Sequence, residues 1–286
     1  MKKILLCTDG SAYSQVSYQY VAWLAQYINI DLEILYVTDS RDEQAVQTHD
    51  FTGSIGIDSY QQLLSELVEL EAAKAKINHQ RAKIILQEAQ QFFSNHQLTK
   101  VKLTHETGFL VDLFQELEQD SDLVVLGKRG ENANFATEHL GANLERIVRS
   151  SHKPCLVTPR EFKPVQRVLF AYDGGKSCHK ALDYLSESPL FPEVELNIIT
   201  VDTGNTEKAQ QHLTTAQETM VKAGFHPTVK LLSGNPETEM ENYIALNNID
   251  FLIMGAYGHS RIRHLIIGST TAQMLRNSNI PVLLFR

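Results

Sequence analysis

The chain contains an internal repeat, and this repeat constrains the fold more than any other feature of the sequence. The segment DLVVLGKRG, which ends at Gly130, is echoed by DFLIMGAYG, which ends at Gly258, 128 residues later (258 − 130). Pro154 opens an apolar run, and Pro281 opens a similar one 127 residues further on (281 − 154). Near-constant offsets in the same order indicate a tandem duplication. We therefore predict two copies of one folding unit.

The two copies differ in length. Each begins with a short apolar run that stops at Asp-Gly, at Asp9 in the first copy and at Asp173 in the second, 164 residues apart (173 − 9). Because the later offset is 128, the first copy carries 36 extra residues (164 − 128). A proline-flanked segment, 159–164, separates the copies, so we predict a first domain over residues 1–160 and a second over 165–286.

The extra residues include a stretch, 59–96, that has neither proline nor glycine. Apolar residues recur along one side of it at helical spacing, and charged residues occupy the rest. These apolar residues are Leu63, Leu67, Leu70, Ile77 and Ile84. We predict an extended helix that packs on its own domain or on a partner; gating of a ligand is the alternative.

Short apolar runs alternate with amphipathic stretches through both copies. Strands are expected at 3–8, 32–37, 100–105, 122–126 and 154–158, and again at 166–172, 194–201, 228–232, 250–254 and 281–285. Helical patterns lie between them, for example at 14–27, 109–119, 213–223 and 269–276. Such alternation is typical of right-handed crossovers and a parallel sheet covered on both faces. The predicted fold class is α/β, with two tandem doubly wound, five-stranded parallel-sheet domains of Rossmann-like type.

The composition excludes several classes of protein. With 43% hydrophobic and 21% charged residues, the chain is typical of a soluble globular protein and not of a disordered one. A net charge of −8 at pH 7 disfavours nucleic acid as a partner. No apolar run is long enough to span a membrane. Three cysteines without paired spacing are typical of reduced thiols, and we expect a cytoplasmic protein.

The motif that points most directly to a function follows the fourth strand of the second copy. Two glycines precede a loop that carries Arg261, and the loop ends in Gly-Ser-Thr before a helical pattern. Glycines let a backbone approach a bulky anion, and the N–H groups at a helix start favour phosphate. The alternative is that the glycines only form a turn and the hydroxyls only cap a helix. The residues of the motif are Gly255, Gly258, Gly268, Ser269 and Thr270.

This Gly-x2-Gly-x9-Gly-Ser spacing, with the Asp-Gly that ends the first strand and the closing Pro-Val-Leu-Leu-Phe run, resembles the universal stress protein family in its tandem form. The resemblance covers essentially the whole chain. It implies an adenine nucleotide alpha hydrolase-like fold and ATP as the ligand, with Mg²⁺ as a companion ion. It also implies that Asp173 lies by the adenine and ribose, that Val201 lines the adenine pocket, and that Ser269 and the glycine loop hold phosphates. Helix capping is the alternative role for Asp173.

The resemblance further implies a cytoplasmic, ATP-binding regulator of a stress response. Its partners would be an adenine nucleotide and a protein that the sequence does not identify. The two halves would pair internally, as two single-domain relatives do, and a homodimer of whole chains is the further option. The sequence supplies no catalytic constellation and no metal site, so we expect no enzyme, or at most slow ATP hydrolysis.

The first copy departs from this motif. Gly127 and Gly130 are retained, but Gly141 follows after ten residues instead of nine, and Ala142 replaces the hydroxyl residue, with Asn143 as a substitute. The loop between them is acidic where the second copy is basic. Of the remaining positions, Asp9 and Val37 correspond to Asp173 and Val201. We expect this second candidate site to be weak, to be empty, or to take another ligand.

An alternative function is a non-catalytic scaffold or interaction protein. Its nucleotide sites would be vestigial, and the first domain would take an apolar ligand. The degenerate first loop and the apolar stripe on the inserted helix motivate this alternative.

Overall fold

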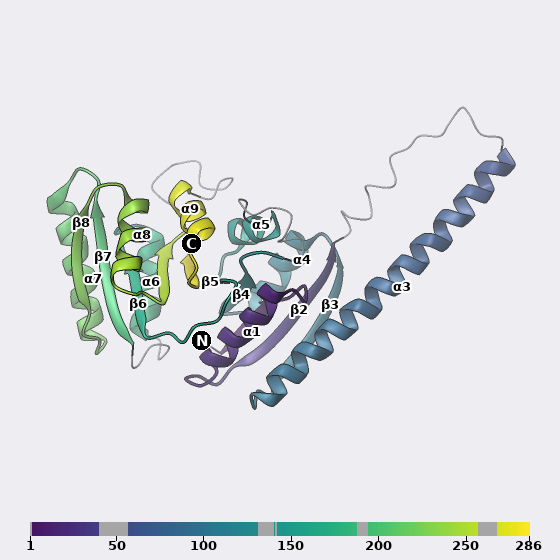
Figure 1. Cartoon of the computed structure of the whole chain (residues 1–286), viewed down its shortest axis with the longest axis horizontal. Coiled ribbons are helices and arrows are strands. Elements are labelled where there is room, and N and C mark those ends of the chain that lie inside the picture. The colour runs from purple at the N-terminus through teal and green to yellow at the C-terminus, as the bar shows by residue number, and fades with distance from the viewer. Residues whose placement is uncertain (1, 40–56, 131–139, 141, 188–193, 257–267) are drawn as a thin grey trace.

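The computed structural model describes residues 2–39, 57–130, 140, 142–187, 194–256 and 268–286. Within them, ten strands form one continuous sheet in the order β3-β2-β1-β4-β5-β10-β9-β6-β7-β8 (Figure 1). The first half supplies β1 (Lys3–Cys7), β2 (Asp31–Asp39), β3 (Val101–Gly108), β4 (Leu123–Gly127) and β5 (Cys155–Thr158). The second half supplies β6 (Arg167–Ala171), β7 (Glu195–Asp202), β8 (Thr228–Ser233), β9 (Phe251–Gly255) and β10 (Val282–Phe285).

Within each half the strand pairs are parallel, and the order reverses at β1/β4 and at β6/β9. This confirms the predicted doubly wound, five-stranded fold of both halves. The two sheets meet through β5 and β10, which pair antiparallel with Leu156 opposite Leu283. Each half therefore closes the exposed edge of the other, and the strand edges that remain belong to β3 and β8.

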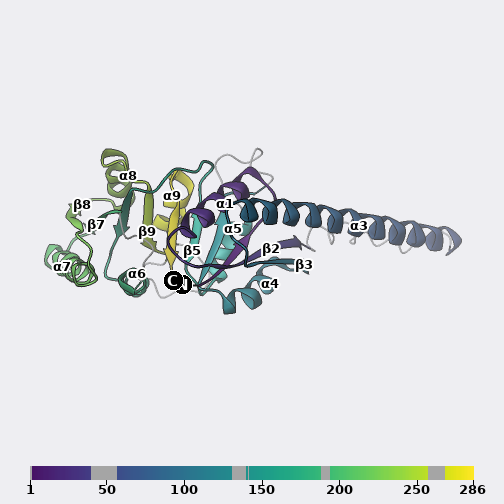
Figure 2. The same ribbon diagram turned by 90° about the horizontal axis from the view of Figure 1, so that it is seen from below.

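The helices cover both faces of the sheet (Figure 2). They are α1 (Ala12–Leu24), α3 (Ile57–Asn95), α4 (Leu110–Leu117), α5 (Ala142–Ser150), α6 (Lys176–Glu187), α7 (Thr206–Lys222), α8 (Pro236–Leu246) and α9 (Ser269–Asn277), with a 3-10 turn at Glu118–Asp120. The boundaries differ from the sequence pattern by a few residues. The largest change is in α7, which begins at Thr206 instead of 213, because the Asn205 side chain accepts the Lys208 N–H and caps it.

Alternate residues of the buried strands point to opposite faces of the sheet and belong to two apolar cores. Ile4 and Leu6 face α1, α3, α6 and α7, while Leu5 faces α4, α5, α8 and α9. The first core runs across the junction between the halves, where the rings of Trp23 and Phe251 lie 6.4 Å apart. The halves are thus packed against each other as well as hydrogen-bonded through their edge strands.

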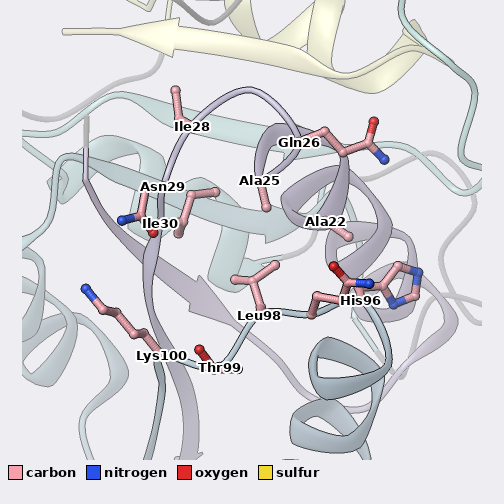
Figure 3. A pocket seen from close by; sticks show the side chains of 11 residues that line it. Ala22, Ala25, Gln26, Ile28, Asn29, Ile30, His96, Leu98, Thr99 and Lys100 are labelled. Carbon is pink, nitrogen blue, oxygen red and sulfur yellow. The ribbon is translucent and has the colours of Figure 1, made fainter.

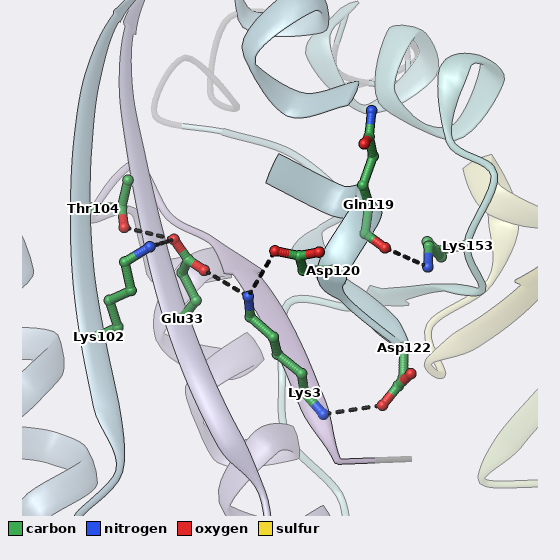
Figure 4. Close-up of polar contacts among 8 residues, drawn as sticks. All are labelled: Lys3, Glu33, Lys102, Thr104, Gln119, Asp120, Asp122 and Lys153. Atoms are coloured by element: carbon green, nitrogen blue, oxygen red, sulfur yellow. Dashed lines mark hydrogen bonds and ion pairs between the residues drawn. The ribbon is translucent and has the colours of Figure 1, made fainter. Parts of the chain in front are cut away.

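The duplication is visible in matching polar contacts. Asp122 accepts the backbone N–H groups of Lys2 and Lys3, at 2.7 and 3.1 Å, and its counterpart Asp250 accepts those of Gln166 and Arg167, at 3.2 and 3.0 Å. Figure 4 shows the Lys3 contact of the first half. In both copies this carboxylate joins the start of the first strand to the start of the fourth. A contact repeated in this way shows that the two halves share their folding geometry.

One buried position differs sharply between the copies. In the first, the Glu33 side chain is 2% exposed and accepts hydrogen bonds from Lys102 Nζ at 2.8 Å and Thr104 Oγ1 at 2.7 Å, with Lys3 Nζ at 3.4 Å (Figure 4). In the second, the corresponding residue (33 + 164) is Asn197, whose amide oxygen accepts the Tyr243 hydroxyl at 3.0 Å. The first half therefore buries a charge where the second buries a neutral amide.

Candidate functional site

The candidate nucleotide site lies where β6, β7 and β9 of the second half end. Asp173 follows β6, Val201 is half-buried near the end of β7, and Gly255 ends β9. Because these strands are parallel, their carboxyl ends meet at one edge of the sheet, beside the reversal of strand order. The structure therefore brings these three predicted residues to the same edge. Gly258 and Arg261 lie outside the described residues.

Gly255 packs closely against α6 at this edge. A Cβ on Gly255 would meet Cys178 Sγ and Ser177 Cβ, each at 3.1 Å, so the first turn of α6 rests on the end of β9. The buried Thr271 hydroxyl donates to the Ala256 carbonyl at 2.9 Å and fixes the first turn of α9 beside the same strand end. The starts of α6 and α9 thus flank one site.

The start of α9 has the features of an anion site. Its N-cap residue is Gly268, no side chain caps it among the described residues, and its first turn has no acidic residue. By contrast, asparagine side chains cap α7 and α8. Ser269 is exposed and Thr270 is half-buried at this end. Uncapped N–H groups, the positive end of the helix dipole and two hydroxyls together favour a phosphate.

The Asp173 turn forms the other side of the site. Gly174 adopts a φ of +70°, and the Gly175 N–H donates to Asp173 Oδ1 at 2.7 Å. The Asp173 side chain is exposed. A Cβ on Gly174 would meet the His212 ring at 2.2 Å, so α7 covers the turn with a polar side chain. Asp173 is therefore exposed at the sheet edge where α9 also begins, with one carboxylate oxygen held by the Gly175 N–H.

Sequence reasoning missed an aromatic and histidine cluster beside this turn. The Tyr172 hydroxyl is hydrogen-bonded to His179 Nδ1 at 3.0 Å, and the rings of Tyr172 and His212 are 6.3 Å apart. His212 comes from a different helix, and nothing in the sequence links it to Tyr172. Only the packing of α7 against the sheet brings them together.

The first half holds the matching aspartate in a different way. Asp9 Oδ1 accepts the Ser11 N–H at 2.9 Å and the Ser14 hydroxyl at 2.7 Å, and the Ser11 side chain in turn accepts the Ser14 N–H and caps α1. In the second half the residue that corresponds to Ser14 is Cys178, whose thiol is a poorer donor. Burial raises the pKa of this thiol, and the charge of Asp173 adds to the increase. Asp9 is thus committed to the start of its own helix.

The remaining positions of the first candidate site are more closed. A Cβ on Gly10 would meet Ile85 Cδ1 of α3 at 2.8 Å, and one on Gly130 would meet Asp9 Oδ2 at 2.7 Å. An apolar side chain therefore covers the first turn where a histidine covers the second. Val37 is half-buried near the end of β2, as Val201 is in β7, and Asn143 is exposed in the first turn of α5. Gly141 lies outside the described residues.

Lys128, a basic residue of the first glycine loop, turns away from that loop. Its ammonium donates to the carbonyls of Arg276 and, at 2.9 Å, Ser278 at the end of α9 in the other half. Burial, with the nearby charge of Arg129, lowers the pKa of Lys128 to about 8. Arg286 makes the reciprocal contact, donating to the Arg149 carbonyl at the end of α5 at 2.7 Å. Each half thus stabilises the carboxyl end of a helix in the other.

A separate cavity of about 340 Å³ lies at the opposite end of the first half (Figure 3). It sits between the chain that follows α1 and the chain that follows α3, at the amino ends of β2 and β3. Apolar side chains, Ala22, Ala25, Ile30 and Leu98 among them, are joined by Gln26, Asn29, His96 and Lys100. This cavity is distant from the strand ends that carry the predicted site residues, and its lining is mixed.

The described residues contain no group of three or more histidine, cysteine, aspartate or glutamate residues that could hold a metal ion. None of the helices described is both long enough and apolar enough to cross a membrane.

Comparison with known proteins gives a consistent family match. The model of the universal stress protein family matches residues 1–159 and again residues 164–286. Universal stress protein Slr1230 of Synechocystis sp. is 51% identical over 287 residues, which cover 100% of both chains. Universal stress protein MJ0577 of Methanocaldococcus jannaschii is 26% identical over 81 residues, which cover 28% of this chain and 50% of that protein.

A solved structure shows the same fold. A universal stress protein from Archaeoglobus fulgidus superposes with a TM-score of 0.71 at 22% identity, covering 99% of this chain and 96% of that one. The tandem arrangement of the two halves is therefore found in a distant structure.

Proposed function

The chain belongs to the universal stress protein family, with two family domains in tandem, and from this premise we propose that it is a cytoplasmic, ATP-binding regulator of a stress response. The observation that supports the proposal most is the start of α9. There an uncapped helix beginning Gly-Ser-Thr lies beside the end of β9 and the exposed Asp173 turn.

In this proposal the second half holds the nucleotide. The backbone N–H groups after Gly268, with the hydroxyls of Ser269 and Thr270, would bind phosphate oxygens, and Gly255 would let the loop pass close to them. Asp173 would accept a ribose hydroxyl, and Val201 would pack against the adenine. Gly258 and Arg261 belong to the same loop, and the guanidinium would add charge for the polyphosphate. Mg²⁺ would enter with the phosphates of ATP, which are its ordinary ligands.

The first half would bind ATP weakly or not at all. Asp9 already accepts two hydrogen bonds from the start of α1, Ile85 covers its turn, and the Lys128 ammonium is bound to the end of α9. A ligand there would have to compete with these contacts. The asymmetry supports a proposal in which the second half binds the nucleotide and the first is its structural partner.

The output of the regulator would be a change in how it contacts another protein. The phosphate site is at the first turn of α9, and the last turn of the same helix receives Lys128 from the first half. If bound nucleotide shifts α9, the contact of Lys128 with the last turn of α9 would change, and with it the junction between the halves. In this proposal ATP works as a bound ligand, with at most slow hydrolysis, and the net charge of −8 disfavours a nucleic acid partner.

The test is stabilisation by ATP. Nucleotide at about 100 times its dissociation constant is expected to raise the free energy of unfolding by about 2.7 kcal/mol. Ser269→Glu places a negative charge at the start of α9, where it suits the helix dipole but repels a phosphate. We expect this variant to fold normally and to lose the gain from ATP, in a thermal unfolding assay with and without nucleotide.

The matched control is Ala142→Glu, which makes the same change at the first residue of α5, the counterpart of α9. It should retain the full gain. Equal stabilisation of Ser269→Glu and the unaltered chain would refute this phosphate site. A gain lost only in Ala142→Glu would move ATP to the first half.

The alternative function is an interaction protein with vestigial nucleotide sites. The exposed apolar residues of α3 and the closed first turn favour it, whereas the mixed lining of the cavity in Figure 3 argues against a purely apolar ligand there. Native mass spectrometry of freshly purified protein separates the two. Bound adenine nucleotide supports the regulator, and a lipid-like mass without nucleotide supports the alternative.

A further inference from the structure

Helix α3 extends far beyond the body of the protein in two perpendicular views (Figures 1 and 2). Only its carboxyl-terminal part is packed, through the buried side chains of Ala82, Leu86, Ala89 and Phe93. From Ser65 to Arg81 every residue is exposed except Leu67 and Asn78, which are half-buried. In proteins most of the stability of a helix comes from packing of its apolar face and less from helix propensity. Something that covers the projecting part would stabilise it.

The projecting part carries an apolar stripe with a seven-residue period. Leu63, Leu70, Ile77 and Ile84 succeed one another every seven residues, and Leu70 and Ile77 are 64% and 67% exposed. Such a repeat supplies one of the two seam positions of a left-handed coiled coil, and the position three residues further on holds Glu66, Ala73 and Gln80. At about 100° per residue, the stripe lies well away from the side that packs on the body. A second helix can therefore reach it without meeting the sheet domains.

The charges of the same segment are separated along its length. Between Leu63 and Leu70 and just beyond, the charged residues are all acidic: Glu66, Glu69 and Glu71. From there to Ile84 they are all basic: Lys74, Lys76, Arg81 and Lys83. A parallel copy would place like charges together, whereas an antiparallel copy places each acidic part against a basic part. The helix is thus complementary to itself in one orientation.

The geometry points to a second copy of this chain as the occupant, bound through an antiparallel pairing of the two α3 helices. Leu70 of one copy would lie opposite Ile77 of the other, and Leu63 opposite Ile84, with Glu69 facing Lys76 across the pair. The contact is isologous, so it closes as a dimer. The central sheet edges are not available for it, because β5 and β10 already pair within one chain. This proposal does not rest on the binding of a nucleotide.

The first experiment measures the mass of the full chain in solution by sedimentation at tens of micromolar. We expect a dimer, and we expect Leu70→Glu to raise its dissociation constant at least tenfold, because a carboxylate would then enter an apolar seam. Val68→Glu is the matched control. Val68 is 65% exposed, so the two changes remove equally exposed apolar side chains, but Val68 lies roughly 200° around the helix from Leu70. It should leave the dimer intact.

The second experiment determines orientation by disulfide cross-linking. Ala73 lies near the centre of the pairing, so Ala73→Cys should form a disulfide between the two copies. Gln80→Cys should not, because its two copies would be about 20 Å apart along an antiparallel pair, at 1.5 Å per residue. In a parallel pair Gln80→Cys would cross-link with itself.

A chain that sediments as a monomer overturns the proposal, and so does a dimer that Leu70→Glu leaves unchanged. Efficient cross-linking of Gln80→Cys overturns the antiparallel orientation. Circular dichroism of each variant checks that the helix content is unchanged. If Leu70→Glu lowers it, Leu70→Gln is used instead, because glutamine is a good helix former that still adds a polar group to the seam.

Discussion

The Asp-Gly turns of the two halves have the same backbone and opposite surroundings. Gly10 and Gly174 adopt φ values of +78° and +70°, and each aspartate accepts a backbone N–H two residues on, yet Asp9 also accepts the Ser14 hydroxyl while Asp173 is exposed. The difference comes from single neighbouring residues, Ser14 against Cys178 and Ile85 against His212. A duplicated fold can therefore keep its backbone geometry while the side chains around the same turn diverge.

The largest expected difference between the halves concerns the glycine that ends the fourth strand. A Cβ on Gly127 would meet Tyr13 Cβ at 2.8 Å and backbone atoms at 3.2 Å, whereas one on Gly255 would meet side-chain atoms at 3.1 Å and its nearest backbone atom, the Cys178 nitrogen, at 3.6 Å. Gly127→Ala should therefore cost about 3 kcal/mol of stability and Gly255→Ala less than about 1 kcal/mol. Urea unfolding midpoints measure both. Equal losses of stability in the two variants would mean that α1 and α6 move aside equally easily to admit the added Cβ.

Of the two aspartates, Asp9 should contribute more to stability and Asp173 more to ATP binding. Asp9→Ala removes two hydrogen bonds at the start of α1 and should cost about 1–2 kcal/mol, while Asp173→Ala, at an exposed side chain, should cost less than about 0.5 kcal/mol. In the ATP stabilisation assay we expect the reverse order, with Asp173→Ala losing the larger gain. A loss of ATP stabilisation only in Asp9→Ala would contradict the proposed assignment.

Low pH should lower the stability of the first half more than that of the second, because only the first buries the Glu33 carboxylate. Burial alone raises the pKa of this carboxyl, but the hydrogen bonds from Lys102 and Thr104 and the charges of Lys102 and Lys3 outweigh it and hold the pKa below its ordinary 4.5. The stabilisation is thus present above pH 4.5 and is lost as the pH falls through the lowered value.

Glu33→Gln should cost about 1 kcal/mol at pH 7 and flatten the dependence of the unfolding midpoint on pH between about 3 and 5. Asn197→Ala, at the uncharged counterpart, should leave that dependence unchanged. If the two variants respond to acid alike, Glu33 is not the source of the difference.

The smallest effect is expected where α3 meets the edge strand β3. His105 accompanies His79 there at 5.4 Å between rings, while the second half has Leu231 in place of His105. Burial lowers the pKa of His105, and the charge of His79 lowers it further, against the opposing charge of Glu106. The folded state thus favours the neutral ring, so stability is complete above about pH 6.5 and falls as the pH drops below it.

Hydrogen exchange of α3 at pH 7.5 and pH 5.5 measures this effect. We expect lower protection factors, with the intrinsic exchange rate at each pH divided out, for the α3 residues near His79 at pH 5.5, and a smaller change in His79→Gln. No change in α7, which has no such pair, is the internal control.

Much of the fold could be predicted from the sequence because it depends on local patterns. The apolar runs that stop at Asp9 and Asp173 mark the ends of β1 and β6, and the stretch without proline or glycine at 59–96 coincides with α3, Ile57–Asn95. The offset glycines also predicted the edge of the sheet at which Gly255 and Asp173 now lie. These features follow from strand and helix periodicity and from the parallel order of the strands.

The candidate site was less predictable because its chemistry depends on where side chains point. Lys128 and Arg129 stand in the first loop by sequence, but the Lys128 ammonium reaches the other half, a direction that only the β5–β10 junction creates. His212 covers Gly174 only because α7 packs on the sheet in that register. By itself the sequence determined a duplicated α/β chain with one complete copy of the glycine motif. The tertiary structure decided that Lys128 leaves the first loop and that His212 covers the second turn, because long-range packing sets the partners of each side chain.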